Sequence, residues 1–135
     1  MPSSLKKPKK KKKPSITRMK READRVFSIF IRMREADEMG MTKCFTCGVK
    51  KHWKDMQNSH FYSRSHMSIR WDEINCNVAC MPCNVYFKGN IAAYALNLTR
   101  KYGAGILEKL EQKRSTILRM NRLEYEKLIA KYKTE

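Results

Sequence analysis

Apolar residues recur at helical spacing in the first and last thirds of this chain, but not between them. Near the N-terminus, Val26, Phe27, Phe30 and Ile31 share one face of a helix predicted at about 17–39, which Gly40 would end. Further helical patterns cover 91–102, 106–113 and 121–132, the last opened by a capping box that starts at Asn121. The middle of the chain lacks this period, and there we predict two short strands at 57–62 and 75–79, joined by an irregular loop.

Four cysteines frame this middle region in two pairs of identical spacing. Cys44 and Cys47 precede the strands, and Cys80 and Cys83 follow them, with Pro82 suited to the first turn of a helix. A Cys-x-x-Cys turn directs both thiolates at one centre, so the two pairs predict a tetrahedral Zn²⁺ site. Four thiolates leave no open coordination position, so this zinc would be structural, and redox pairs are the competing interpretation. The fifth cysteine, Cys76, is predicted to be a buried apolar residue and not a ligand.

The fold class that follows is α+β, a small zinc-stabilised core with flanking N- and C-terminal helices. We divide the chain into a disordered basic tail (1–20) and one domain (21–135). The domain comprises an N-terminal helix (21–40), the zinc core of two strands and a helix (41–102) and C-terminal helices (103–135). The apolar stripes of the first helix and of the 106–132 region are either internal core or the contact surface of a homodimer.

Charge separates the tail from the domain and suggests a polyanionic partner. The 135 residues carry a net charge of +17, and ten of the 30 basic residues lie before Glu22, where no acidic residue occurs. A lysine run of this kind binds phosphates by releasing counterions; a solubilising tail or a nuclear import signal are the alternatives. Neither a membrane span nor a secretory signal is evident, so we expect an intracellular, non-secreted protein with no membrane contact. The expected DNA-binding residues are Lys9, Lys10, Lys11, Lys12, Lys13, Arg64, His66, Arg70 and Lys88.

Polar groups suited to chemistry lie between and just after the cysteine pairs. His60 is a candidate general base, because an imidazole accepts a proton near neutral pH. Asn84, next to the last cysteine, is a candidate ligand of a divalent ion through its amide oxygen. The plainer interpretation makes His60 a structural strand residue and Asn84 a helix cap.

The order of these residues resembles the zinc-bearing HNH (ββα-metal) nucleases. The resemblance rests on Cys44-x-x-Cys47, His60, Asn75 and Cys80-x-x-Cys83-Asn84. A closer similarity is to the phage NinG/Rap recombination nucleases, over about 25–105. It is carried by the segments Phe27-Ser28-x-x-Ile31-Arg32-x-Arg34, His60-x-x-Ser63-Arg64, Arg70-Trp71-Asp72-Glu73-x-Asn75-Cys76 and Tyr94-x-x-Asn97-Leu98.

The resemblance implies a ββα-metal core and a structure-selective DNA endonuclease acting on branched recombination intermediates such as Holliday junctions and D-loops. By position, His60 would activate water, Asn84 would ligate Mg²⁺ or Mn²⁺, and Asn75 would brace the loop that orients the histidine. A phage recombinase or a single-strand-binding protein would be a further partner. One departure is Ser59, where many HNH enzymes carry an acidic metal ligand; Asp55, Asp72 or Glu73 could complete the shell. For Asp72 and Glu73, pairing with Arg70 is the alternative.

Two interpretations of the function without catalysis compete with the nuclease. The first is a zinc-stabilised nucleic-acid-binding protein that uses His60 only structurally, which Ser59 favours. The second is a small ribosome-associated protein, which would share the size and the lysine-rich tail but has no need of His and Asn in this register.

Overall fold

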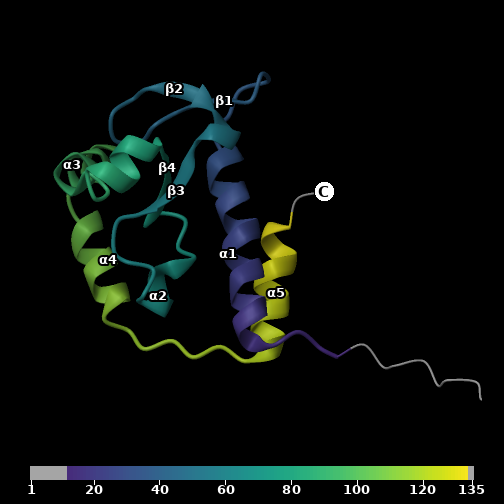
Figure 1. The fold of residues 1–135 in the computed structure, drawn as a ribbon. Coiled ribbons are helices and arrows are strands. Elements are labelled where there is room, and N and C mark those ends of the chain that lie inside the picture. The colour runs from purple at the N-terminus through teal and green to yellow at the C-terminus, as the bar shows by residue number, and fades with distance from the viewer. Residues whose placement is uncertain (1–11, 134–135) are drawn as a thin grey trace, which may run out of the picture.

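The computed structural model describes residues 12–133 and places five α-helices around two small antiparallel sheets (Figure 1). The long helix α1 (Ile16–Met33) and helix α5 (Arg122–Tyr132) run side by side on one flank. Helices α3 (Ile91–Tyr102) and α4 (Ile106–Arg114) lie on the other flank, and the short α2 (Met67–Arg70) lies between. The mixed α+β class is therefore confirmed. No helix within 12–133 is long and apolar enough to span a bilayer.

Helix α1 begins and ends earlier than the sequence predicts. Ser15 caps it by accepting a hydrogen bond from Arg18 N at 3.2 Å. The chain is therefore helical from Ile16, within the segment 1–20 that was predicted to be a disordered tail. It stops at Met33 because Asp37 Oδ1 accepts hydrogen bonds from the backbone N–H groups of Met39 and Met41, both at 2.9 Å, and so favours a turn. Lysines 9–11 of the predicted tail lie outside the described residues.

The apolar stripe of α1 is an internal core surface. Val26, Phe27 and Ile31 are buried against Tyr132, and Phe27 meets the Tyr132 ring edge-on at 4.8 Å. The stripe is covered by α5 of the same chain, so it is not free for the homodimer contact that the sequence left open. Asn121 caps α5 by accepting from Glu124 N at 2.9 Å, as its capping box predicts.

The two strands predicted from the sequence form one of the sheets. β3 (Gln57–His60) pairs antiparallel with β4 (Cys76–Ala79), in a register that sets His60 opposite Cys76. The other sheet, β1 (Met41–Lys43) with β2 (Lys50–His52), was not predicted because each strand has only three residues and lacks apolar alternation. Gly40 precedes β1 with φ +78°, and a Cβ there would lie 2.4 Å from His52 Nε2, so only glycine fits.

Tyr94 joins helix α3 to the β3–β4 pair through its hydroxyl group. This fully buried Oη donates toward Ser59 O at 2.7 Å and Asn75 O at 3.1 Å, and it accepts from Asn77 Nδ2 at 3.1 Å. Tyr94→Phe keeps the ring but removes the hydroxyl group, so Ser59 O, Asn75 O and Asn77 Nδ2 each lose one hydrogen bond inside the protein. We expect the variant to lose about 1–3 kcal/mol of unfolding free energy, measured by urea denaturation.

The matched control is Tyr102→Phe, because Tyr102 is only partly buried at the end of the same helix. It should unfold at nearly the wild-type urea concentration. Equal stability of Tyr94→Phe and wild type would contradict the role given to the Tyr94 hydroxyl.

Candidate functional site

The four paired cysteines converge on one point. Cys44 and Cys47 lie in the turn after β1, and Cys80 and Cys83 lie where β4 passes into a short π-helix, η2 (Pro82–Tyr86). The four sulfur atoms are within 4.8 Å of one another, and the Sγ atoms of Cys47 and Cys80 are 3.7 Å apart. A tetrahedron with Zn–S bonds of ~2.3 Å has edges of about 3.8 Å. The cluster therefore has the ligand type and spacing that zinc requires.

The surroundings of the cluster suit thiolates held by a cation. Cys47 N donates to Cys44 Sγ at 3.5 Å, and Asn90 Nδ2 donates to Cys83 Sγ at 3.9 Å. Four ionised sulfurs this close together would repel one another, so they need a bound cation to offset their charge. Cys76 lies apart from the cluster, is fully buried against α1 residues, and burial raises its pKa, as expected of a non-ligand.

A cleft of about 340 Å³ opens between α1 and β3 and contains both catalytic candidates. His60 lies on its β3 side, and Asn84 reaches it from η2. Its remaining lining residues are Asp24, Phe27, Ser28, Arg32, Met56, Gln57, Asn58 and Arg64.

The imidazole of His60 is held in one orientation and one tautomer. Its Nε2 lies 2.9 Å from the backbone oxygen of Arg70, and since a carbonyl can only accept, Nε2 must carry the proton. In the neutral ring, Nδ1 then has the free lone pair. Burial lowers the pKa of His60, opposed by the hydrogen bond to Arg70 O and by the charge of Asp24. The residue is therefore neutral, and able to accept a proton, at pH 7.

Asn84 is oriented by its neighbour on β3. Its Nδ2 donates to Gln57 Oε1 at 2.6 Å, so the side-chain amide is fixed and Oδ1 is the atom left for another partner. Asn58 also contributes to the cleft, and its Oδ1 is buried with no hydrogen-bond partner among residues 12–133. Amide oxygens of this kind suit a hard divalent ion.

Arg70 has a different role from the one predicted. Its guanidinium group forms a two-pronged ion pair with Asp24 of α1 and donates to Arg64 O at 3.1 Å. Trp71 Nε1 also donates to Asp24, at 3.0 Å. With its side chain 13% exposed, Arg70 is used inside the protein and is not available to DNA. The Asp24–Arg70 pair instead fixes the segment whose carbonyl orients His60.

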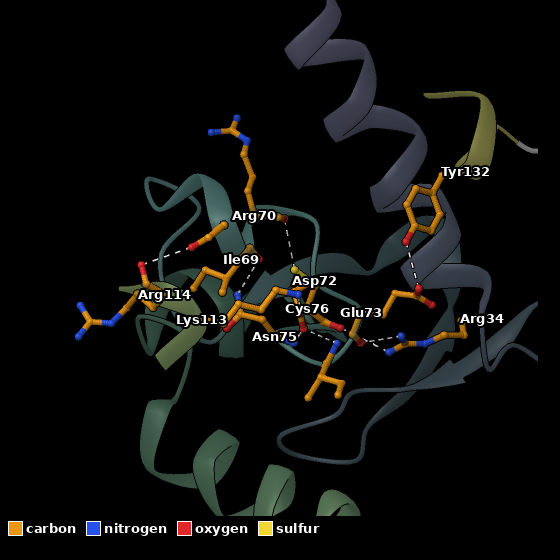
Figure 2. A network of polar contacts seen from close by, with 12 residues as sticks. Arg34, Ile69, Arg70, Asp72, Glu73, Asn75, Cys76, Lys113, Arg114 and Tyr132 are labelled. Atoms are coloured by element: carbon orange, nitrogen blue, oxygen red, sulfur yellow. Dashed lines mark hydrogen bonds and ion pairs between the residues drawn. The ribbon is translucent and has the colours of Figure 1, made fainter. Parts of the chain in front are cut away.

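Asn75 braces the loop from its interior and does not reach the cleft. Its side chain is fully buried, accepts from Tyr62 N at 2.9 Å and donates to Tyr62 O. It also donates to Ile69 O (Figure 2). Ile69 directly precedes Arg70, so this bracing acts on the segment that holds the histidine. The place of Asn75 thus matches the bracing expected of it, while any chemical effect on His60 stays a prediction.

The loop carboxylates are also structural. Asp72 pairs with Lys113 and accepts from Ile74 N and Asn75 N, both at 2.9 Å, while Glu73 accepts from Tyr132 Oη at 3.0 Å (Figure 2). The expected pairing of either residue with Arg70 was wrong, because Asp24 occupies that guanidinium group. Neither they nor Asp55 lines the cleft.

The remaining predicted residues divide by exposure. Ser59 is fully buried and does not line the cleft. Arg64 lines the cleft, whereas His66 precedes α2 outside it. Lys12, Lys13 and Lys88 are exposed. Sequence reasoning gave no site role to Asp24 or Arg32, although Arg32 lies in one of the segments that carry the family resemblance. The signal that could have found both is the helical face that they share with Phe27 and Ser28.

Comparison with known proteins supplies a family. A sequence profile described as "Bacteriophage Lambda NinG protein" matches residues 3–135. The chain belongs to the NinG family. Proteins named "Protein ninG" from Escherichia phage 933W and Salmonella phage P22 are 25% and 26% identical over 91 residues. Each alignment covers 67% of this chain and 43% of the relative, so the aligned part is under half of the relative's length. No solved structure matches the chain.

Proposed function

We propose that this NinG-family protein is a metal-dependent endonuclease that hydrolyses phosphodiester bonds in branched DNA. The observation that carries the proposal is a single cleft that contains both catalytic candidates and two arginines. In it, His60 is neutral with a fixed tautomer, and the side-chain amide of Asn84 is held in one orientation. Antiparallel strands followed by a helix, joined by four zinc-type cysteines, support a ββα-metal nuclease core.

In this mechanism the water oxygen attacks phosphorus while His60 Nδ1 takes the water proton. The bond to the 3′ oxygen breaks, and that oxygen leaves and is protonated by solvent, giving a 5′ phosphate and a 3′ hydroxyl. Positioned proton transfer contributes typically ~10²–10⁴-fold. Arg32 is held by Ser28 and by Trp53 O at 3.4 Å, and with Arg64 it supplies positive charge for the phosphate.

Asn84 Oδ1 is the protein oxygen that would hold the divalent ion, and Asn58 Oδ1, which is unpartnered in the lining of the same cleft, is a second candidate. A Mg²⁺ or Mn²⁺ ion there would stabilise negative charge on the phosphate oxygens. Mg²⁺ keeps several waters and takes few protein ligands when a phosphate is present, so this sparse set fits it.

The direct test is cleavage of an end-labelled four-way junction and a matched linear duplex, with and without Mg²⁺. We expect Mg²⁺-dependent cleavage of the junction in preference to the duplex. Binding without cleavage under all metal conditions would reject the nuclease. It would favour the second candidate, a zinc-stabilised nucleic-acid-binding protein. One observation favours that candidate: the only carboxylate lining the described cleft, Asp24, is already paired with Arg70.

The pH dependence of cleavage reports on His60. Because burial lowers the pKa of His60, the active neutral form persists to moderately acidic pH, and the rate should rise with pH along a limb set by that pKa. Asp24 raises the pKa of His60, so Asp24→Asn should move the rising limb to lower pH. Single-turnover rates between pH 4.5 and 8 measure this shift.

Glu22→Gln is the matched control, because Glu22 lies on the same helix and pairs with Arg25 away from the cleft. Its pH profile should match wild type. A shift of the Asp24→Asn limb to higher pH would contradict the assignment of His60 as the base.

A further inference from the structure

The turn that follows Asn84 exposes an unusual amount of apolar surface. Val85, Tyr86 and Phe87 are consecutive and are 53%, 71% and 64% exposed. They lie between β4 and α3, at the end of η2 and just beyond it (Figure 1). Aromatic side chains of globular proteins usually bury most of their surface, so two neighbouring exposed rings call for a binding role.

The backbone beneath these rings is fixed and does not fray. Phe87 N donates to Pro82 O at 3.0 Å, Gly89 N to Cys83 O at 2.9 Å, and Asn90 N to Phe87 O at 2.8 Å. The segment is therefore anchored to a cysteine of the metal cluster. Rings on a fixed backbone lose little entropy on binding, which favours their use as a contact surface.

Neither ring has a partner within the described part of the chain. The aromatic and cation–π contacts between residues 12 and 133 do not include Tyr86 or Phe87, and neither residue belongs to a core cluster. Their apolar faces are thus open to a ligand.

Charge indicates which ligand fits. A second copy of this chain also carries +17, so self-association through an uncompensated face is opposed by repulsion. Exposed Lys88 follows the rings, and the cleft beside Asn84 carries Arg32 and Arg64. A flat ring beside cationic groups fits a polymer with negative phosphates and planar bases. In a duplex those bases are already stacked, whereas unpaired bases are free to stack on protein rings.

We propose that Tyr86 and Phe87 form a stacking platform for unpaired bases beside the cleaved phosphate. The proposal rests on the proposed nuclease function and gives it a source of selectivity for branched over linear DNA. Phe87 follows Asn84 by three residues, and three residue steps span at most ~11 Å. At ~3.4 Å per nucleotide, the platform lies within about three nucleotides of the phosphate at Asn84.

The test uses the zinc-loaded 135-residue chain. Its ligand is a forked DNA with 2-aminopurine at an unpaired position next to the branch, without added Mg²⁺. Wild type should quench the 2-aminopurine fluorescence by stacking and bind the fork more tightly than the duplex. The double variant Tyr86→Ala/Phe87→Ala should lose the quenching and bind the fork roughly tenfold more weakly per ring removed. Its affinity for duplex should not change.

Two controls separate stacking from general damage. Tyr86→Trp/Phe87→Trp should keep the quenching, and Ile117→Ala, at an 85% exposed apolar residue on a distant segment, should behave as wild type. Unchanged quenching in the alanine variant, with wild type binding DNA, would overturn the platform alone. If the alanine variant instead changed its particle mass in light scattering and still bound the fork like wild type, the rings would serve self-association. That result would also overturn the stacking platform. Failure of wild type to bind any DNA would overturn both proposals.

Discussion

Cys83→Ser is expected to lose its zinc and most of the ordered structure around the β3–β4 pair. The small core beneath this pair consists of Cys44, Cys80 and Cys83 with three apolar residues, so the ligands themselves are half of the core. Without the ion, nothing offsets the negative charge of the thiolates. The three remaining apolar residues bury too little surface to order the β3–β4 pair by themselves. In small zinc domains the metal-binding free energy is largely the folding free energy. Zinc per chain by mass spectrometry and thermal unfolding by circular dichroism measure the loss.

Cys76→Ala is the matched control for this experiment. Cys76 is as buried as Cys83 but lies among α1 and α5 residues, outside the sulfur cluster. It should keep one zinc per chain, with a moderate loss of stability from the removed sulfur. A Cys83→Ser protein that retained stoichiometric zinc and the wild-type melting temperature would show that the four cysteines are not a metal site.

His60→Ala is expected to lower cleavage of a branched DNA by about 10²–10⁴-fold, the usual contribution of a positioned general base. Binding of the same DNA should change little, because the cationic groups of the cleft and of the tail remain. Single-turnover cleavage and equilibrium binding, measured on one substrate, separate the two effects. Since the imidazole also donates to Arg70 O, a melting curve must accompany the kinetics.

His66→Ala is the control here. His66 is partly buried on the same loop but does not line the cleft, so its removal should leave the cleavage rate within a few-fold of wild type. Cleavage by His60→Ala at the wild-type rate would reject His60 as the base. A large loss in His66→Ala alone would transfer that role to the other histidine.

Much of the local structure was predictable because its causes lie within a few residues of one another. The capping box at Asn121 predicted the start of α5, and the two Cys-x-x-Cys turns predicted the sulfur cluster. The absence of a helical period in the middle of the chain located the β3–β4 pair within two residues at its ends. The NinG resemblance read from the sequence is matched by the family assignment, whereas the nuclease activity that it implies stays a proposal.

The site itself could be predicted only in part. His60 and Asn84 were selected by their positions around the cysteines, and the structure brings both to one cleft. Asp24 was missed, because its partner Arg70 lies 46 residues further along the chain. Because Arg70 pairs with Asp24, it is not available to bind DNA as expected. Asp72 and Glu73 contact Lys113 and Tyr132 instead.

The sequence by itself determined the pairing of the four clustered cysteines, the helix caps and the strongly basic character of this protein, since each follows from residue type and short-range spacing. Only the tertiary structure decided which surface of α1 is covered by α5, which carboxylate holds Arg70, and which nitrogen of His60 is free. These depend on the packing of α1 against α5 and the β3–β4 sheet, a set of long-range contacts that buries Val26, Phe27 and Ile31. No local pattern encodes the partner of such a face.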